Sequence, residues 1–152
     1  MANTYTQIYL HVVFAVSGRG CVIGTERREE LQKYLTGIVT RQGQKVVAIY
    51  CRPDHTHVLL GLKLNARPSD VVGAIKTGST NHINEQLWIG CRFSWQTGYS
   101  AFSVSHSHLA RVNYIGGQES HHRRRSFREE YVRFLERHGV SFDQKYLLQS
   151  IE

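Results

Sequence analysis

His55 and His57, which flank Thr56, are the residues whose types and spacing point most directly to chemistry. Residues two apart on a β-strand project from the same face, so both imidazoles can reach one metal ion if this segment is a strand. Imidazole is a common ligand of zinc and of other divalent transition metals. A pattern of two histidines also arises often by chance, with the side chains packed or solvated instead. A metal site therefore needs further ligands.

Tyr114 and Gln118 are the second pair with chemical potential. Four residues separate them, which places both on one face of a helix. Both side chains can then enter the same site, where the amide oxygen of Gln118 is a candidate third ligand. Gly116 and Gly117 lie between them, and each weakens a helix by about 1 kcal/mol relative to alanine. The alternative interpretation is a fraying helix end with a half-buried tyrosine.

The first half of the chain predicts a strand, a helix and a hairpin. Apolar residues alternate along residues 6–16, as in a strand with one buried face. Thr25 can cap a helix that ends near Gly43 and carries one apolar stripe. Residues 45–51 and 56–63 form two apolar strands joined by a turn at residues 52–54. On the second of these strands Thr56 shares the face of the apolar residues, so the histidines should face the open side of the sheet.

The second half predicts another helix, a strand and further helices. Residues 69–87 have a helical apolar period, with inward side chains at Val72, Ile75, Ile83 and Leu87. Residues 95–104 form a fourth strand, interrupted at Gly98. A third helix, capped by Ser105 or Ser107, contains Tyr114 and Gln118, and a fourth extends from a Ser126–Glu129 capping box to Gly139. Residues 141–152 form a less defined tail.

The order βαββαβ predicts an α+β fold of the ferredoxin-like, RRM-like kind. It has a four-stranded antiparallel sheet, helices on one face and additional C-terminal helices. A length of 152 residues fits a single domain spanning residues 1–152.

Composition limits the class of protein. No apolar run is long enough to span a bilayer, and no secretory signal is visible, so we expect a cytoplasmic protein without a membrane partner. Cys21, Cys51 and Cys91 are odd in number and widely spaced, which suits packing residues in a reducing compartment.

The formal net charge of +7 favours a polyanionic partner such as nucleic acid. For each candidate contact a solvated charge or a buried aromatic is an equally good interpretation. The candidates for DNA binding are Arg52, Lys76, His82, Arg123, Arg124 and Arg125, with Trp95 or Tyr99 as base-stacking groups.

Three motifs together resemble one family. They are residues 53–57 (PDHTH), 95–105 (WQTGYSAFSVS) and 114–119 (YIGGQE). In order and spacing they resemble the small single-tyrosine HUH transposases of bacterial insertion sequences, the TnpA-like transposases, over residues 5–139. The family's middle residue between the histidines is usually large and hydrophobic. Thr56 departs from that pattern and would need a hydrogen-bond partner if buried.

The resemblance implies a role for each residue. His55, His57 and Gln118 would bind a divalent ion, Mg²⁺ or Mn²⁺, and Tyr114 would attack single-stranded DNA to form a 5′-phosphotyrosine. It also implies recognition of DNA hairpins at the element ends, a homodimer and no nucleotide cofactor.

His11 shares a strand face with Tyr9. A histidine at such a position is more commonly packed in the core or exposed to solvent. The alternative is that His11 lies beside the metal site, because the first and third strands are neighbours in this fold.

Three other functions compete with the transposase. One is a related or domesticated HUH nuclease. Another is a non-catalytic module that binds single-stranded nucleic acid, because ferredoxin-like sheets often present aromatics to single strands. The third is a zinc protein that uses His55, His57 and a cysteine.

Overall fold

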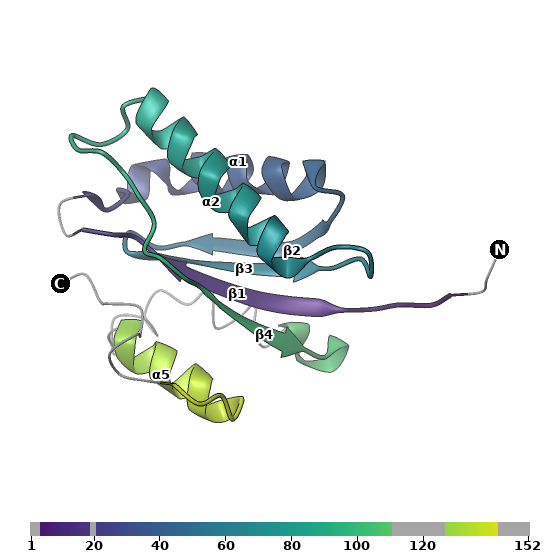
Figure 1. The fold of residues 1–152 in the computed structure, drawn as a ribbon. Coiled ribbons are helices and arrows are strands. Elements are labelled where there is room, and N and C mark those ends of the chain that lie inside the picture. Colours follow the sequence, from purple (N-terminus) through teal and green to yellow (C-terminus); the bar gives the residue numbers. More distant parts are fainter. Residues whose placement is uncertain (1–3, 19–20, 111–126, 143–152) are drawn as a thin grey trace.

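The computed structural model describes residues 4–18, 21–110 and 127–142 (Figure 1). The order of elements up to the fourth strand is βαββαβ, as predicted. The strands are β1 (Tyr9–Ala15), β2 (Lys45–Cys51), β3 (His55–Gly61) and β4 (Ser100–Val104). The helices are α1 (Arg28–Arg41), α2 (Pro68–Glu85) and α5 (Phe127–Arg137), with short 3₁₀ turns η2 (Thr25–Arg27) and η3 (His106–His108). Residues 111–126, which contain the predicted third helix, lie outside the described part, as does Ser126 of the predicted capping box.

The four strands form one antiparallel sheet in the order β2-β3-β1-β4. β1 and β3 are therefore the two central strands, and Val13 lies opposite His57 in their ladder. The alternating pattern that predicted these strands arises because successive side chains enter opposite faces of the sheet. The ferredoxin-like α+β prediction is confirmed.

The main core lies between the sheet and helices α1 and α2, which cover the same face (Figure 1). Val12, Phe14, Val58 and Leu60 enter this core from the two central strands. Thr56 enters it as well and is fully buried. The prediction that Thr56 shares the helix-covered face, with the histidines on the other, is confirmed.

Helix α5 packs against the opposite face of the sheet (Figure 1). Tyr131, Phe134 and Leu135 form a second core there with Val13 and Phe102. The side chain of Tyr131 also hydrogen-bonds that of Ser100 on β4. The expectation that this face stays open is wrong, because the apolar stripe of α5 is buried against it.

The ends of the helices differ in part from the prediction. Thr25 does not cap α1; it begins η2, and the N-cap residue is Arg27. Gly43 and Gly139 do follow α1 and α5, with positive φ values of 79° and 65°. Leu87, predicted to point inward, is 82% exposed and lies beyond the end of α2.

Trp95 belongs to the core and not to the sheet. β4 begins only at Ser100, and Trp95 contributes an isolated bridge to Val16. Its ring packs edge-on against Phe14, and its Nε1 donates a hydrogen bond to Ser79 Oγ (2.9 Å). A base-stacking role for Trp95 is therefore wrong, because the indole is buried and its donor is used internally.

The cysteines also differ from the prediction. Cys21 and Cys91 form a disulfide that joins the segment after β1 to the loop after α2. Only Cys51, which is buried, is a packing residue as predicted. Long-range pairing of this kind carries no local signal, because it depends on two loops meeting in space. In the part of the chain that is described, no helix is long and apolar enough to cross a membrane.

We expect thiol counting to follow this arrangement. The native protein should show no thiol that reacts quickly, the denatured protein one, and the denatured and reduced protein three, since the chain has 3 cysteines. The substitution Cys91→Ser should lower the free energy of unfolding by about 4 kcal/mol, the chain-entropy value for a sequence separation of 70 residues. Urea denaturation measures this change, and reduced wild-type protein is the matched control. Three reactive thiols in denatured, unreduced protein would contradict the disulfide.

Candidate functional site

His55 and His57 lie side by side at the start of β3. Their ring centroids are 5.0 Å apart, and the rings are nearly perpendicular, at 78°. Both are buried, with exposed fractions of 3% and 6%. The strand pairs with β1 on one side and β2 on the other, so both backbones are held in ladders. The predicted juxtaposition of the two imidazoles is confirmed.

Each imidazole is oriented by a hydrogen bond at its Nδ1 atom. Nδ1 of His55 lies 2.6 Å from Oδ1 of Asp54, and Nδ1 of His57 lies 2.8 Å from Nε2 of His11. The rings of His11 and His57 stack at 5.1 Å. His11 therefore lies beside the site, the less common of the two roles expected for it. Partners of this kind fix the tautomer and the direction of a metal-binding histidine.

The turn before His55 is held by backbone hydrogen bonds. The amide of Arg52 donates to the carbonyl of His55 (2.7 Å) and closes the hairpin. The amides of Val16 and Ile23 donate to the carbonyls of Asp54 (2.8 Å) and Pro53 (3.2 Å). The segment after β1 thus supports the turn that carries Asp54, and the carboxylate is presented to His55 by a fixed backbone.

Helix α5 packs against His57 and its partner His11. The ring of Phe134 lies 5.1 Å from that of His11 and 6.4 Å from that of His57. Phe102 of β4 stacks on Phe134 at 5.7 Å. The histidines accordingly sit between the sheet and an aromatic layer. Exclusion of water from such a site strengthens electrostatic interactions within it.

Thr56 and Cys51 pair across the ladder on the opposite face of the sheet. Burial raises the pKa of the Cys51 thiol to about 12, and the neighbouring Thr56 hydroxyl and Arg28 charge partly oppose this rise. Among the described residues, the buried Oγ1 of Thr56 has no hydrogen-bond partner, so the partner expected for a buried Thr56 is absent there. Cys51 is directed away from the histidines, and Cys21 and Cys91 are bonded to each other. The zinc site formed by both histidines and a cysteine is therefore wrong.

Arg52, one of the predicted DNA-binding residues, lies in the turn that leads to His55. It is 6% exposed, and its guanidinium carbon lies 4.2 Å from the ring centre of Tyr50. The guanidinium of Arg28 lies 5.3 Å from the same ring and donates to the Tyr50 hydroxyl (3.2 Å). Tyr50 is the cross-strand neighbour of His57. Two arginines and a tyrosine thus flank the histidines at the β2 edge.

Tyr50, Arg28 and the role of Asp54 were not predicted from the sequence. A signal existed only for Asp54, because a metal-binding imidazole usually donates its second N–H to a carboxylate and Asp54 directly precedes His55. Tyr50 and Arg28 are brought to the site by the pairing of β2 with β3 and by the packing of α1, which no local pattern reveals.

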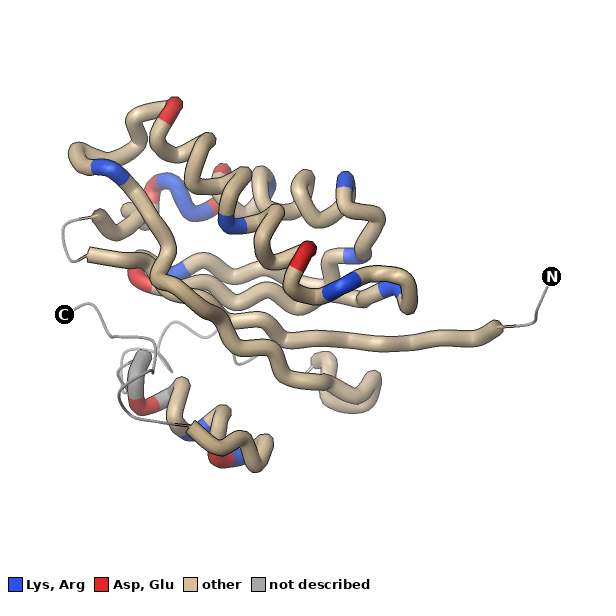
Figure 2. Tube along the Cα trace, viewed as in Figure 1, with Lys and Arg blue, Asp and Glu red and all other residues tan. Residues whose placement is uncertain are grey.

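Lys76 and His82 lie on α2, across the sheet from the histidines. The ammonium of Lys76 donates to the carbonyls of Gln96 (2.9 Å) and Gly98 (2.5 Å), and burial lowers its pKa. His82 stacks on Tyr34 at 3.9 Å. Their part in DNA binding stays a prediction. Figure 2 shows basic and acidic positions intermixed along α1 and α2.

Five predicted residues lie outside the described part of the chain. They are Tyr114, Gln118, Arg123, Arg124 and Arg125. Among the residues that are described, no group of three His, Cys, Asp or Glu side chains could hold a metal ion. The described residues consequently offer two oriented imidazoles, and a metal site with three protein ligands would need one from outside them.

The site can be compared with known proteins. The family described as "Transposase IS200 like" matches residues 4–118, a span that includes His55, His57, Tyr114 and Gln118. The ISDra2 transposase TnpA of Deinococcus radiodurans is 28% identical over 120 residues, covering 74% of this chain and 84% of that protein.

Two solved structures share the fold. One is a protein of Deinococcus radiodurans R1 classed as a candidate transposase, with a TM-score of 0.59 and 27% identity; 78% of this chain and 95% of that chain are covered. The other is a REP-associated tyrosine transposase bound to a REP hairpin, with a TM-score of 0.55 and 15% identity over 76% of this chain and 70% of that one. The family match spans well over half of the sequence. This chain therefore belongs to the family of IS200-like transposases, which cleave and transfer DNA.

Proposed function

We propose that this transposase is a metal-dependent enzyme that cuts and rejoins single-stranded DNA at the ends of an insertion sequence through Tyr114. The observation that carries the proposal is the pair His55 and His57, whose Nδ1 atoms are both held by partners. With Nδ1 protonated, His55 donates to Asp54 and His57 donates to His11. The nitrogen that would coordinate a metal is then Nε2 on each ring.

The residues present fit a divalent ion. His55 and His57 would hold it through two buried Nε2 atoms, and Gln118 would add an amide oxygen. An imidazole and amide set does not choose between metals by ligand type, and the family resemblance favours Mg²⁺ or Mn²⁺. When bound, the ion would polarise the scissile phosphate and offset the charge that develops during its displacement.

Tyr114 supplies the nucleophile in this proposal. Its phenol oxygen forms a bond to phosphorus while the bond to the 3′ oxygen breaks, which leaves a 5′-phosphotyrosine and a 3′-hydroxyl. The phenol proton is lost to solvent and the leaving oxygen gains one. A second 3′-hydroxyl can reverse the reaction, because the phosphotyrosine retains the phosphodiester bond. Joining therefore needs no nucleotide cofactor.

The partners belong to the same proposal. We expect recognition of DNA hairpins near the element ends, as the hairpin-bound neighbour of the same fold illustrates for its own substrate. We also expect a homodimer, and Arg123, Arg124 and Arg125 are the basic residues best placed in sequence, just beyond Tyr114, to contact the DNA backbone.

The test uses labelled single-stranded and duplex DNA that tiles the flanks of the gene, incubated with Mn²⁺ or with EDTA and separated on a denaturing gel. A covalent protein–DNA adduct should form on single strands with Mn²⁺ and be absent with EDTA. Tight single-strand binding without an adduct on any tile would favour the non-catalytic binding module instead.

The substitution His11→Leu tests how the site is oriented. It removes the acceptor for Nδ1 of His57, which lies 2.8 Å away. Loss of such a partner lowers metal affinity by about 10–100-fold. Titration of Mn²⁺, followed by the EPR signal of the free ion, should show this decrease, and adduct formation should recover at high Mn²⁺. The exposed His108 provides the control His108→Leu, which should leave the Mn²⁺ affinity unchanged. Equal affinities in all three proteins would contradict a supporting role for His11.

A further inference from the structure

In the described part of the chain, the helices α1, α2 and α5 end in the same hydrogen-bonding motif, and α2 has an unusual residue in it. The residue after the C-cap has a positive φ in each: Gly43 (79°), Gly139 (65°) and Leu87 (52°). The next amide along then bonds back to a carbonyl five residues earlier: Gln44 to Val39 (3.2 Å), Val140 to Leu135 (2.9 Å) and Trp88 to Ile83 (3.3 Å). Glycine is the usual residue in this position because it has no Cβ.

Leu87 is therefore expected to destabilise the protein relative to glycine. The left-handed conformation brings Cβ too close to the following carbonyl oxygen. Packing does not compensate, because the side chain is 82% exposed. Among the residues that the structure describes, Leu87 is the one residue other than glycine with positive φ. Local strain of this kind is often retained where a side chain has a functional contact.

The loop that carries Leu87 is firmly held. The amide group of Asn84 makes two hydrogen bonds with the backbone of Phe93, one to its N–H (2.8 Å) and one to its carbonyl (3.1 Å). The Cys21–Cys91 disulfide attaches the same loop to the segment after β1. Trp88 packs against His82 and lies 5.1 Å from the guanidinium of Arg27. The exposure of Leu87 is thus imposed by a rigid support.

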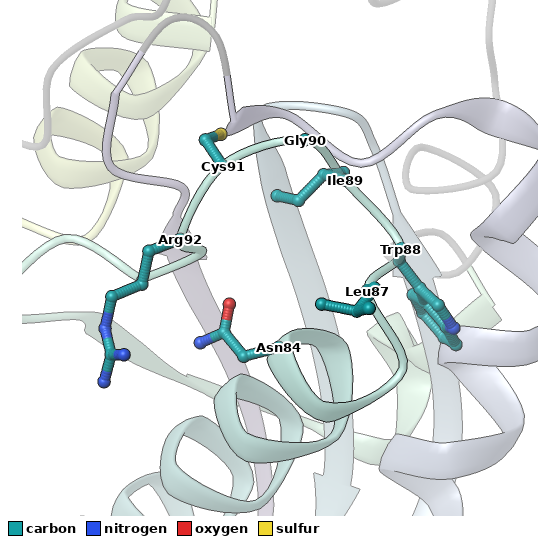
Figure 3. A pocket seen from close by; sticks show the side chains of 7 residues that line it. All are labelled: Asn84, Leu87, Trp88, Ile89, Gly90, Cys91 and Arg92. Carbon is teal, nitrogen blue, oxygen red and sulfur yellow. The ribbon is translucent and has the colours of Figure 1, made fainter.

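A cavity of about 670 Å³ lies at this loop, within the range of roughly 300–1,000 Å³ typical of ligand sites. It is lined by Asn84, Leu87, Trp88, Ile89, Gly90, Cys91 and Arg92. Figure 3 shows Leu87 and Ile89 directed toward one space, with Arg92 across it and the Trp88 ring on the far side of the loop. The lining joins an apolar wall to one cation.

This cavity and the histidine pair lie at the same end of the sheet. β1 ends and β3 begins there, with Ala15 opposite His55 in the ladder. The segment after β1 connects the two places: Ser17 N–H donates to the Ser94 carbonyl (2.9 Å), and Ile23 N–H donates to the Pro53 carbonyl (3.2 Å). The loop follows α2 and so lies on the opposite face of the sheet from the histidines, and a strand of DNA that contacts both places must pass around this end of the sheet.

We infer that the cavity at residues 84–92 is a subsite for an unpaired nucleobase of the single-stranded DNA substrate, with Leu87 and Ile89 against the base and Arg92 on a neighbouring phosphate. The inference rests on the proposed function for its substrate. Apolar side chains, leucine included, stack on bases, and arginine binds phosphate. Arg92 is the one cation among the residues that line the cavity, so the phosphate contact is assigned to it.

The test separates contacts to the base from contacts to the backbone. An oligothymidylate of about 20 nucleotides, longer than the roughly 4–16 that a small domain covers, is compared with an abasic strand of equal charge. Fluorescence anisotropy in EDTA measures binding without cleavage. Wild-type protein should bind oligothymidylate more tightly than the abasic strand.

The two loop variants should act differently. Leu87→Gly should weaken oligothymidylate binding by about tenfold, leave abasic binding unchanged and raise the Tm by about 3 °C as strain is removed. Arg92→Gln should weaken binding to both strands and reduce the slope of log Kd against log salt by about 1. Gain of stability with loss of base binding is a result that a purely structural loop would not give.

Matched controls lie at the other end of the sheet. Leu64 is 64% exposed in the turn after β3, and Arg67 is exposed just before α2. Leu64→Gly and Arg67→Gln should leave both affinities unchanged. Unchanged affinities in Leu87→Gly and Arg92→Gln, or a change in self-association alone, would overturn the inference. If these variants still form adducts, the proposed function remains supported although the subsite is wrong. If wild-type protein forms no adducts, the proposed function is wrong whatever the loop variants show.

Discussion

Tyr114→Phe should abolish the covalent protein–DNA adduct, with a decrease in rate of at least about 10³-fold. The substitution removes one oxygen atom and keeps the ring. It therefore eliminates the nucleophile while disturbing packing little. Affinity for single-stranded DNA should remain within about twofold of the wild-type value, because phosphate contacts dominate such binding. Denaturing gels measure the adduct, and anisotropy measures the affinity.

The control is Tyr99→Phe. Tyr99 is a partly exposed tyrosine, 37% accessible, whose ring lies 5.9 Å from the ammonium of Lys76. Adduct formation should be normal in this variant. If Tyr114→Phe forms adducts as well as wild-type protein does, another residue is the nucleophile. If it neither binds nor cleaves, and its Tm is lowered, the tyrosine is a packing residue and its proposed role is wrong.

His57→Ala should lower adduct formation by at least about 100-fold at limiting Mn²⁺, because it removes one of the two imidazole ligands. It also removes the hydrogen bond to His11 and leaves a gap beneath Phe134. We therefore expect the free energy of unfolding to fall by roughly 1–3 kcal/mol, the usual cost of leaving a buried polar group, here His11, without its hydrogen-bond partner. Thermal melts distinguish this change from the loss of metal binding.

Direct measurement of bound Mn²⁺ gives the decisive readout. Wild-type protein should bind Mn²⁺, and His57→Ala should bind it with at least tenfold lower affinity. Loss of a ligand, or of the residue that orients it, lowers metal affinity by this much or more. His106→Ala, an exposed histidine of η3, should bind Mn²⁺ normally. Normal Mn²⁺ uptake by a folded His57→Ala protein would contradict the assignment of His57 as a ligand.

Much of the site's geometry follows from local spacing. Alternation along residues 55–61 is enough to put His55 and His57 on one face of β3 and Thr56 on the other. The fold order could be predicted for the same reason, since strand and helix periods are properties of short segments. Gly43 and Gly139 marked two helix ends because positive φ is local as well.

The predictions that failed were made from local patterns, and contacts between distant residues overrode those patterns. Leu87 continues the apolar period of α2, yet it lies beyond the end of the helix. The chain turns there, and a hydrogen bond from the Phe93 N–H to Asn84 Oδ1 holds the turn. Trp95 fits a strand pattern, but its indole is drawn into the core by Ser79 and Phe14. α5 was predicted with its apolar stripe, and no local feature showed which surface that stripe would cover.

The sequence by itself determined the βαββαβ order of the elements and the opposite faces of β3 on which Thr56 and the two histidines lie. The tertiary structure decided that His11, 46 residues away, orients His57, that Cys21 bonds Cys91, and that Phe134 covers the histidines. The physical reason is that backbone periods are set within a few residues, whereas contacts between distant segments form only when burial of apolar surface brings whole elements together.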